Sequence, residues 1–131
     1  MIDHMTIKVA DFDRARAFYD AVFAPLGVSL ILMAPPEAQM KAGGYGRGKP
    51  VFWVREGTPP PADYQQHIAF AAGSRAEVDA FYRAAIAAGG RDNGPPGPRP
   101  HYRPDYYAAF VFDLDGNNIE AVCRAAEASQ G

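Results

Sequence analysis

The sequence has little cysteine, no long apolar run and no excess of basic charge. Its single cysteine, Cys123, cannot form a disulfide within the chain, which is typical of a reducing cytoplasm. No apolar run approaches the roughly 18 residues of a membrane span, and no signal-peptide pattern opens the chain. The formal net charge of −2 does not favour nucleic-acid binding, which needs a basic stripe. We therefore expect a cytoplasmic protein with no membrane or nucleic-acid partner.

The 131 residues are enough for one domain, and this domain contains an internal repeat. Three short anchors recur at an offset of 63 residues: His4 with His67, Ala17-Phe18-Tyr19 with Ala80-Phe81-Tyr82, and Gly27 with Gly90. A shared offset indicates a tandem duplication. We predict a first module at about 1–62, a second at about 63–124, and a frayed tail at 125–131.

Each module is expected to begin with a strand and a helix. Apolar and polar residues alternate from residue 4 to 9 and again from 67 to 71, as in half-buried strands. Apolar residues at the spacing of one helix face follow around 15–26 and 78–89, which predicts two helices. Further strands are predicted at 28–33, 39–42, 51–54, 107–112 and 118–122. Between them, the segment 91–105 holds five prolines, which excludes a central strand and predicts a long loop.

The glycine-rich stretch 43–49 matches the start of a phosphate-binding loop. Pro50 follows, where that motif needs a hydroxyl for magnesium, and a strand is expected where it needs a helix. We interpret this stretch as a hairpin and exclude nucleotide binding.

His4, His67 and Glu120 are the strongest candidates for a functional site. Side chains alternate across a strand, so these three point away from the face that the helices cover. If the repeats pair symmetrically, they converge in one cleft. Two imidazoles and one carboxylate suit Fe(II), Mn(II), Ni(II), Co(II) or Zn(II). A lone histidine or acidic residue is more often structural or solvated, so the hypothesis depends on all three together.

The motifs around these residues resemble the vicinal oxygen chelate superfamily, which includes glyoxalases, bleomycin-resistance proteins and extradiol dioxygenases. The resemblance extends to about Cys123 and is carried by the segments 2–9, 67–70 and 113–120 and by the repeated Ala-Phe-Tyr helices. It implies an α+β fold in which two tandem βαβββ modules form an incomplete barrel around a cleft. It also implies a divalent metal held by His4, His67 and Glu120, and a homodimer.

The resemblance departs from glyoxalase I at one position. Those enzymes carry a second glutamate on the last strand of the first module, where this chain has Phe52 or, with a one-residue slip, Trp53. The remaining ligand set is more similar to extradiol dioxygenases and fosfomycin-resistance thiol transferases. The latter also resemble the chain at Thr6, at Trp53 and at 62–64.

We therefore expect a metal-dependent enzyme acting on a small oxygen-chelating substrate, as a lyase, isomerase, thiol transferase or dioxygenase. The alternative is a metal-free protein of the bleomycin-resistance type that sequesters a small molecule. Glu120 and His101 are the predicted catalytic residues, although His101 is equally interpretable as an exposed loop residue. The predicted substrate-binding residues are Thr6, Phe52, Trp53, Arg99, Tyr102 and Tyr107.

Overall fold

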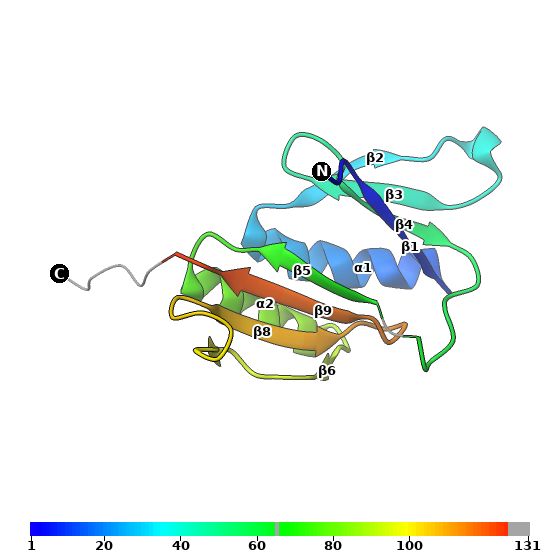
Figure 1. Cartoon of the computed structure of the whole chain (residues 1–131). Coiled ribbons are helices and arrows are strands. Elements are labelled where there is room, and N and C mark those ends of the chain that lie inside the picture. Colours follow the sequence, from blue (N-terminus) through cyan, green and yellow to red (C-terminus); the bar gives the residue numbers. More distant parts are fainter. Residues whose placement is uncertain (65, 126–131) are drawn as a thin grey trace.

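The computed structural model describes residues 1–64 and 66–125 and has the same order of elements in both halves (Figure 1). The predicted tail at 125–131 lies, except for Ala125, outside the described residues. The first half contains β1 (Met5–Val9), α1 (Phe12–Phe23), the 3-10 helix η1 (Ala24–Leu26), β2 (Ser29–Met33), the 3-10 helix η2 (Pro36–Ala38), β3 (Ala42–Gly46) and β4 (Phe52–Glu56). The second contains β5 (His67–Ala71), α2 (Arg75–Ala87), β6 (Arg91–Asp92), β7 (Gly97–Pro98), β8 (Tyr107–Phe112) and β9 (Asn118–Cys123).

Each half builds its own sheet, and the strand order is equivalent in the two sheets. The first sheet has the order β1-β4-β3-β2 and the second β5-β9-β8-β6, with β7 also paired to β8. In both, the first strand of the module runs parallel to the last one, β1 with β4 and β5 with β9. The predicted α+β fold of two βαβββ modules is confirmed, although the two sheets do not close into a barrel.

The helices begin at polar caps and lie on one side of the sheets (Figure 1). The Asp11 side chain accepts a hydrogen bond from the Arg14 backbone N–H at the start of α1, and Ser74 accepts one from the Glu77 N–H at the start of α2. Alternate strand residues such as Ile7 and Val9 are buried beneath the helices. Within residues 1–64 and 66–125, no helix covers the opposite faces of the two sheets.

The two modules share one core. The Phe70 ring of β5 lies 4.8 Å from Phe23 of α1 and 5.2 Å from Phe52 of β4, measured between ring centroids. Both contacts are edge-on, which is a favourable aromatic arrangement. Helices α1 and α2 also contact each other directly. The modules therefore pack through helices and aromatic side chains, side by side.

The proline-rich segment contains more regular structure than the sequence predicts. Its two short strands, β6 and β7, pair antiparallel with opposite ends of β8 and form the edge of the second sheet. Pro98 is tolerated there because an edge strand needs ladder hydrogen bonds on one side only. Within the described ranges, no helix is long and apolar enough to cross a membrane.

Candidate functional site

A buried carboxylate lies on the uncovered face of the second sheet. Glu120 of β9 is 1% exposed, and its Oε1 lies 2.8 Å from Nε2 of His67 at the start of β5. The parallel register aligns Ala69 with Glu120, so the histidine two residues earlier can reach the carboxylate across the strand pair. The His67 side chain remains 53% exposed. The structure thus brings together two of the three predicted metal ligands, with one side open to solvent.

Tyr106 completes this arrangement, although the predicted substrate-binding residues include its neighbour Tyr107 and not Tyr106 itself. Its hydroxyl donates a hydrogen bond to the second carboxylate oxygen of Glu120, Oε2. Burial and this hydrogen bond raise the pKa of Tyr106 to about 12, so its hydroxyl is protonated at neutral pH. Tyr106 lies on the same side as Phe110, which is in register with Glu120, but it precedes β8, so the alternation of strand residues alone does not single it out.

Tyr107, predicted to bind substrate, points the other way. Its hydroxyl donates a hydrogen bond to Oδ1 of Asp79 on α2, at a distance of 2.7 Å. Adjacent strand residues face opposite sides of a sheet, so only one of the two tyrosines can reach Glu120. Tyr106, and not Tyr107, therefore contacts the Glu120 carboxylate.

His4 lies in the other module, away from His67 and Glu120. Its Nδ1 is 2.7 Å from Oδ1 of Asp3, and Asp3 also accepts a hydrogen bond from Lys49. The bonds from Lys49 and His4 lower the pKa of Asp3, which keeps this carboxylate an acceptor. The proton of neutral His4 therefore sits on Nδ1 and leaves the Nε2 lone pair available to a ligand.

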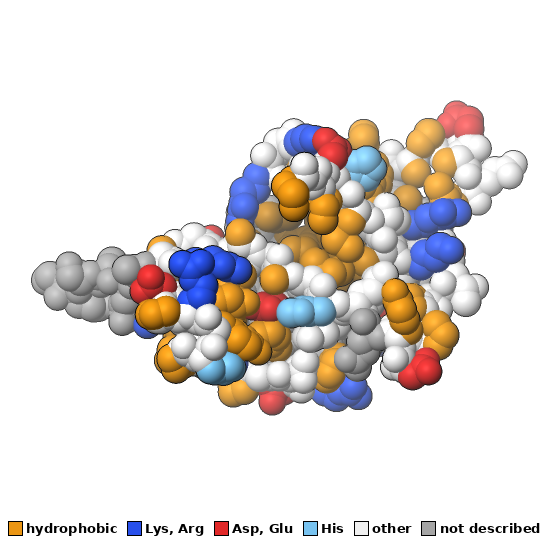
Figure 2. All heavy atoms as spheres, viewed as in Figure 1, with side chains coloured by type: hydrophobic (Ala, Val, Ile, Leu, Met, Phe, Trp, Pro, Cys, Tyr) orange, Lys and Arg blue, Asp and Glu red, His pale blue; other side chains and the backbone are white. Residues whose placement is uncertain are grey.

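The expected convergence of His4, His67 and Glu120 in one cleft does not occur within a single copy of the chain. In residues 1–64 and 66–125, no three His, Cys, Asp or Glu side chains gather to hold a metal ion. The histidine side chains lie apart on the face shown in Figure 2. The physical reason is that the modules pack side by side through their helices, so the two uncovered sheet faces do not oppose each other.

The strand register identifies the counterpart of Glu120 in the first module. Thr6 follows His4 by two residues and pairs with Trp53, just as Ala69 follows His67 by two and pairs with Glu120. Trp53 therefore occupies the position equivalent to Glu120. The first module offers one potential ligand, His4, beside an indole, whereas the second offers a histidine and a carboxylate.

Thr6 and Trp53 line a pocket of about 650 Å³ on the uncovered face of the first sheet. Phe52, predicted to line the cleft with them, is instead 4% exposed and packs against Tyr19, Phe23 and Phe70. Phe52 and Trp53 are adjacent residues of β4, so their side chains face opposite sides of the sheet. Phe52 belongs mainly to the shared core.

The other predicted residues lie in the loop that approaches the Glu120 face. The rings of His101 and Tyr102 are 4.2 Å apart, and the Tyr102 ring is 5.1 Å from that of Tyr106. Arg99 donates hydrogen bonds to the carbonyl oxygens of Gly97 and Pro95 and lies over the Phe110 ring. His101 is exposed, and the rings of Tyr102 and Tyr106 separate it from the Glu120 carboxylate.

Comparison with known proteins identifies the family to which this fold belongs. The model of the Glyoxalase/Bleomycin resistance protein/Dioxygenase superfamily matches residues 1–121. The chain belongs to this superfamily. No curated protein matches it.

Solved structures of the same fold cover nearly the whole chain. A glyoxalase/bleomycin resistance protein from Albidiferax ferrireducens T118 is 31% identical, with 93% of this chain and 97% of that chain covered and a TM-score of 0.69. The fosfomycin resistance protein FosX from Mesorhizobium loti is 21% identical, with 90% and 86% covered and a TM-score of 0.67. A mutant FosX from Listeria monocytogenes, solved with Mn(II) and 1S,2S-dihydroxypropylphosphonic acid, is 21% identical, with 99% and 92% covered and a TM-score of 0.70.

Proposed function

We propose that this chain is a metal-dependent enzyme acting on a small oxygen-chelating substrate, and that two copies of the chain share each metal site. His67 and Glu120 of one copy and His4 of a second copy would be the ligands. The observation that carries the proposal is the pairing of His67 with Glu120, a histidine and a buried carboxylate that are open to solvent on one side. The Mn(II) bound by the mutant FosX supports a divalent ion in this fold.

The donor set is chemically suited to such an ion. Two neutral imidazoles and a carboxylate bind Fe(II), Mn(II), Ni(II), Co(II) and Zn(II) and leave coordination positions for substrate oxygens. Two of the three proposed ligands also have an orienting partner: Asp3 holds Nδ1 of His4, and Tyr106 holds Oε2 of Glu120. Such outer partners fix the orientation of metal ligands. When bound, the ion would supply Lewis-acid stabilisation of a developing negative charge on the substrate.

A second copy is required because one copy separates the ligands. The chain exposes two unequal half-sites, one with His4 beside Trp53 and the other with His67 beside Glu120. In a two-fold dimer, every contact between the two copies occurs twice, once in each direction. The His4 half-site of each copy would therefore meet the His67 half-site of its partner. His4, Thr6 and the pocket would then form one wall, and His67, Glu120 and Tyr106 the other.

Metal retention tests the ligand assignment. The purified protein is incubated with each of the five divalent ions, desalted and analysed by mass spectrometry. We expect near one equivalent per chain of at least one ion in the wild type. His4→Ala, His67→Ala and Glu120→Gln should each lose it, whereas His101→Ala should retain it. Wild-type protein that retains no ion, and shows none by titration, would overturn the proposal.

Complementation between inactive variants tests whether the site is shared. Mixed dimers of His4→Ala with His67→Ala contain one intact site, so random mixing should restore about a quarter of the wild-type metal content. The matched control mixes His67→Ala with Glu120→Gln, which damage the same half-site, and should restore none. Equal metal contents in the two mixtures would contradict a shared site.

A second candidate function is metal-free binding of a small molecule. It is favoured by the polar groups of the second half-site, because His67 and Tyr106 already satisfy both carboxylate oxygens of Glu120. The metal measurement separates the candidates. A protein that binds small molecules yet takes up no ion would belong to this second class.

A further inference from the structure

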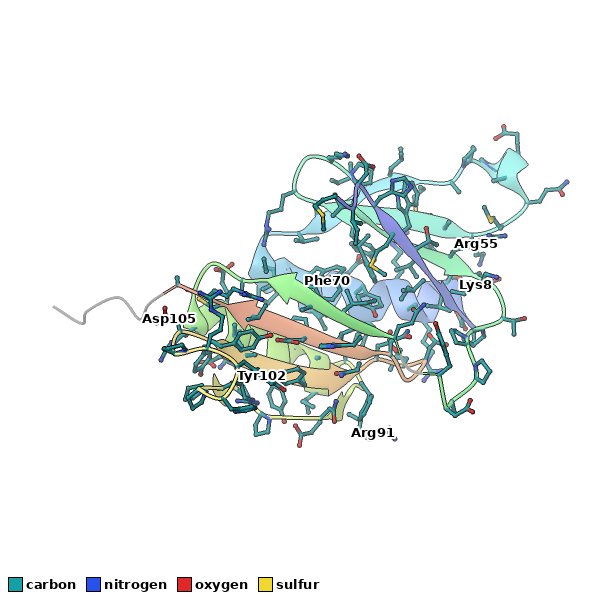
Figure 3. The ribbon with its side chains drawn as sticks, viewed as in Figure 1. Lys8, Arg55, Phe70, Arg91, Tyr102 and Asp105 are labelled. Carbon is teal, nitrogen blue, oxygen red and sulfur yellow. The ribbon has the colours of Figure 1, made fainter. Side chains whose placement is uncertain are left out.

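The pocket on the first sheet is lined at one end by two basic side chains that lie side by side, those of Lys8 and Arg55. Its apolar wall comprises Leu32, Met33, Ala34, Pro35, Met40 and Trp53, while Lys8 and Arg55 line it as well. Lys8 of β1 and Arg55 of β4 are direct neighbours in the strand register, and both are exposed. Figure 3 shows them on adjacent strands at the same end of the sheet, and Figure 2 shows two adjacent patches of basic side chains at that place.

Among the described residues, no ion pair neutralises either cation. Across residues 1–64 and 66–125, the ion pairs use other basic side chains, those of Arg16, Lys41 and Lys49 among them, and none involves Lys8 or Arg55. Like charges directly opposite each other on neighbouring strands destabilise a sheet. This arrangement is favourable once an anion binds between them, since a guanidinium and an ammonium both donate charge-assisted hydrogen bonds.

The apolar part of the pocket is shaped around the indole of Trp53. A Cβ on Gly44 would lie 2.9 Å from two carbons of the indole ring, so the glycine leaves the space that the ring needs against β3. Leu32 is 52% exposed and Met40 is 40% exposed, which leaves apolar surface for a ligand to cover. An organic body can therefore lie on the indole while its charged end meets Lys8 and Arg55.

We infer that this pocket binds an organic anion with an apolar body, and that its anionic group lies at Lys8 and Arg55, remote from the metal ligands. This inference rests on the proposed function and specifies its substrate class. His4, Thr6 and Lys8 alternate along one strand face, so Lys8 lies about 13 Å along the strand from His4. The substrate would thus have its oxygen-chelating group near His4, its apolar body over Trp53 and its anionic group beyond it.

Trp53 is the only tryptophan of the chain, so its emission reports directly on this pocket. Phenylpropionate and its neutral isostere phenylpropanamide are titrated separately into metal-loaded protein, with excitation at the red edge of indole absorption. We expect the acid to change the emission and to bind at least about tenfold more tightly than the amide, as for a charge-assisted contact. Added salt should weaken binding of the acid and leave binding of the amide unchanged.

Two substitutions locate the anionic end. Lys8→Gln and Arg55→Gln should each reduce the affinity for the acid by about tenfold or more and leave the affinity for the amide unchanged. Arg83→Gln, which removes an equal charge from the exposed surface of α2, is the matched control and should bind both ligands as the wild type does. Far-ultraviolet circular dichroism checks that the variants fold, and the salt dependence of the wild type does not depend on any variant.

Equal affinities for acid and amide, or no emission change with either ligand up to its solubility limit, would overturn the inference. An acid preference that survives both Lys8→Gln and Arg55→Gln would also overturn it. Metal content measured on the same preparation separates this failure from failure of the proposed function. A protein that retains its ion but shows no acid preference would keep the proposed function and lose only the anionic substrate class.

Discussion

At the scale of single residues, the environment of Glu120 determines what the second half-site can bind. The carboxylate is buried and is held from two sides, by His67 at Oε1 and by Tyr106 at Oε2. A metal ion bound as proposed would approach from the side of His67, because that side chain is 53% exposed whereas Glu120 is 1% exposed. Tyr106 is therefore in position to fix the orientation of a ligand without binding the ion itself.

Tyr106→Phe is expected to weaken metal binding about 10- to 100-fold, because loss of an outer hydrogen-bond partner leaves the ligand less well oriented. Titration with the retained ion measures the affinity. Tyr107→Phe is the matched control, since it removes a hydroxyl from the adjacent residue on the helix side and should leave the metal affinity unchanged. Unchanged affinity in Tyr106→Phe would show that the hydroxyl has no role in orienting Glu120.

Strand parity predicted His67 and Glu120 correctly as neighbours on the uncovered face, because both lie in regular strands. Parity could not identify Tyr106, which immediately precedes β8 at the end of an irregular loop. It also could not show that His4 is separated from His67. That separation depends on how the modules pack against each other, and no local pattern in either module encodes it.

At the scale of elements, β3 is the least conventional strand. Three of its five residues are glycine, yet all five are buried. Close packing accounts for all three glycines. A Cβ on Gly43 would lie 2.7 Å from Leu30, one on Gly44 2.8 Å from Pro50, and one on Gly46 1.7 Å from the carbonyl oxygen of Lys49. The strand thus accommodates a core side chain on one face and Trp53 on the other.

Gly44→Ala is expected to displace the indole of Trp53 and to cost about 1–3 kcal/mol of stability through overpacking. Trp53 emission and the free energy of unfolding in denaturant measure the two effects. Gly57→Ala is a suitable control, because its added Cβ would meet only Lys8, at 3.5 Å and an ordinary contact distance. A wild-type emission spectrum together with wild-type stability in Gly44→Ala would contradict this account of β3.

The elements that the sequence predicted well are those with regular periodicity. The strand at 107–112 agrees with β8, and both helical stripes fall on α1 and α2. The strand expected at 39–42 forms instead at 42–46, because its glycines provide no alternation of apolar and polar side chains. The pairing of β6 and β7 was also missed, since edge strands this short have no period to detect.

At the scale of the whole molecule, three polar links hold the modules side by side. Tyr19 of α1 donates a hydrogen bond to Asp113, Asp115 accepts one from the Ala10 N–H, and Arg47 donates to the carbonyl oxygens of Leu26 and Ala71. Together with the shared aromatic core, these contacts hold the two modules against each other through their helices. In the described part of the chain, one face of each sheet is thereby left without a covering helix, which is the arrangement that the proposed shared metal site requires.

The link between Tyr19 and Asp113 makes a specific pH dependence testable. Burial and the nearby Asp113 carboxylate raise the pKa of Tyr19 well above its usual value of about 10, whereas unfolding restores that value. The neutral hydroxyl therefore contributes its full stability below about pH 10. That contribution declines as the pH rises further, because the unfolded chain ionises first.

Tyr19→Phe is expected to be less stable than the wild type at pH 8 by about 1–3 kcal/mol, because Asp113 loses a buried hydrogen-bond donor. This difference should shrink by about 1 kcal/mol between pH 10 and pH 11, since only the wild type has a protonated Tyr19 to lose on unfolding. Urea unfolding at the three pH values measures it, with Tyr64→Phe, which removes an exposed tyrosine, as the control for the substitution itself. A difference that stays constant up to pH 11 would mean that Tyr19 ionises equally in the folded and unfolded chain. The buried hydrogen bond between the modules would then not hold at high pH.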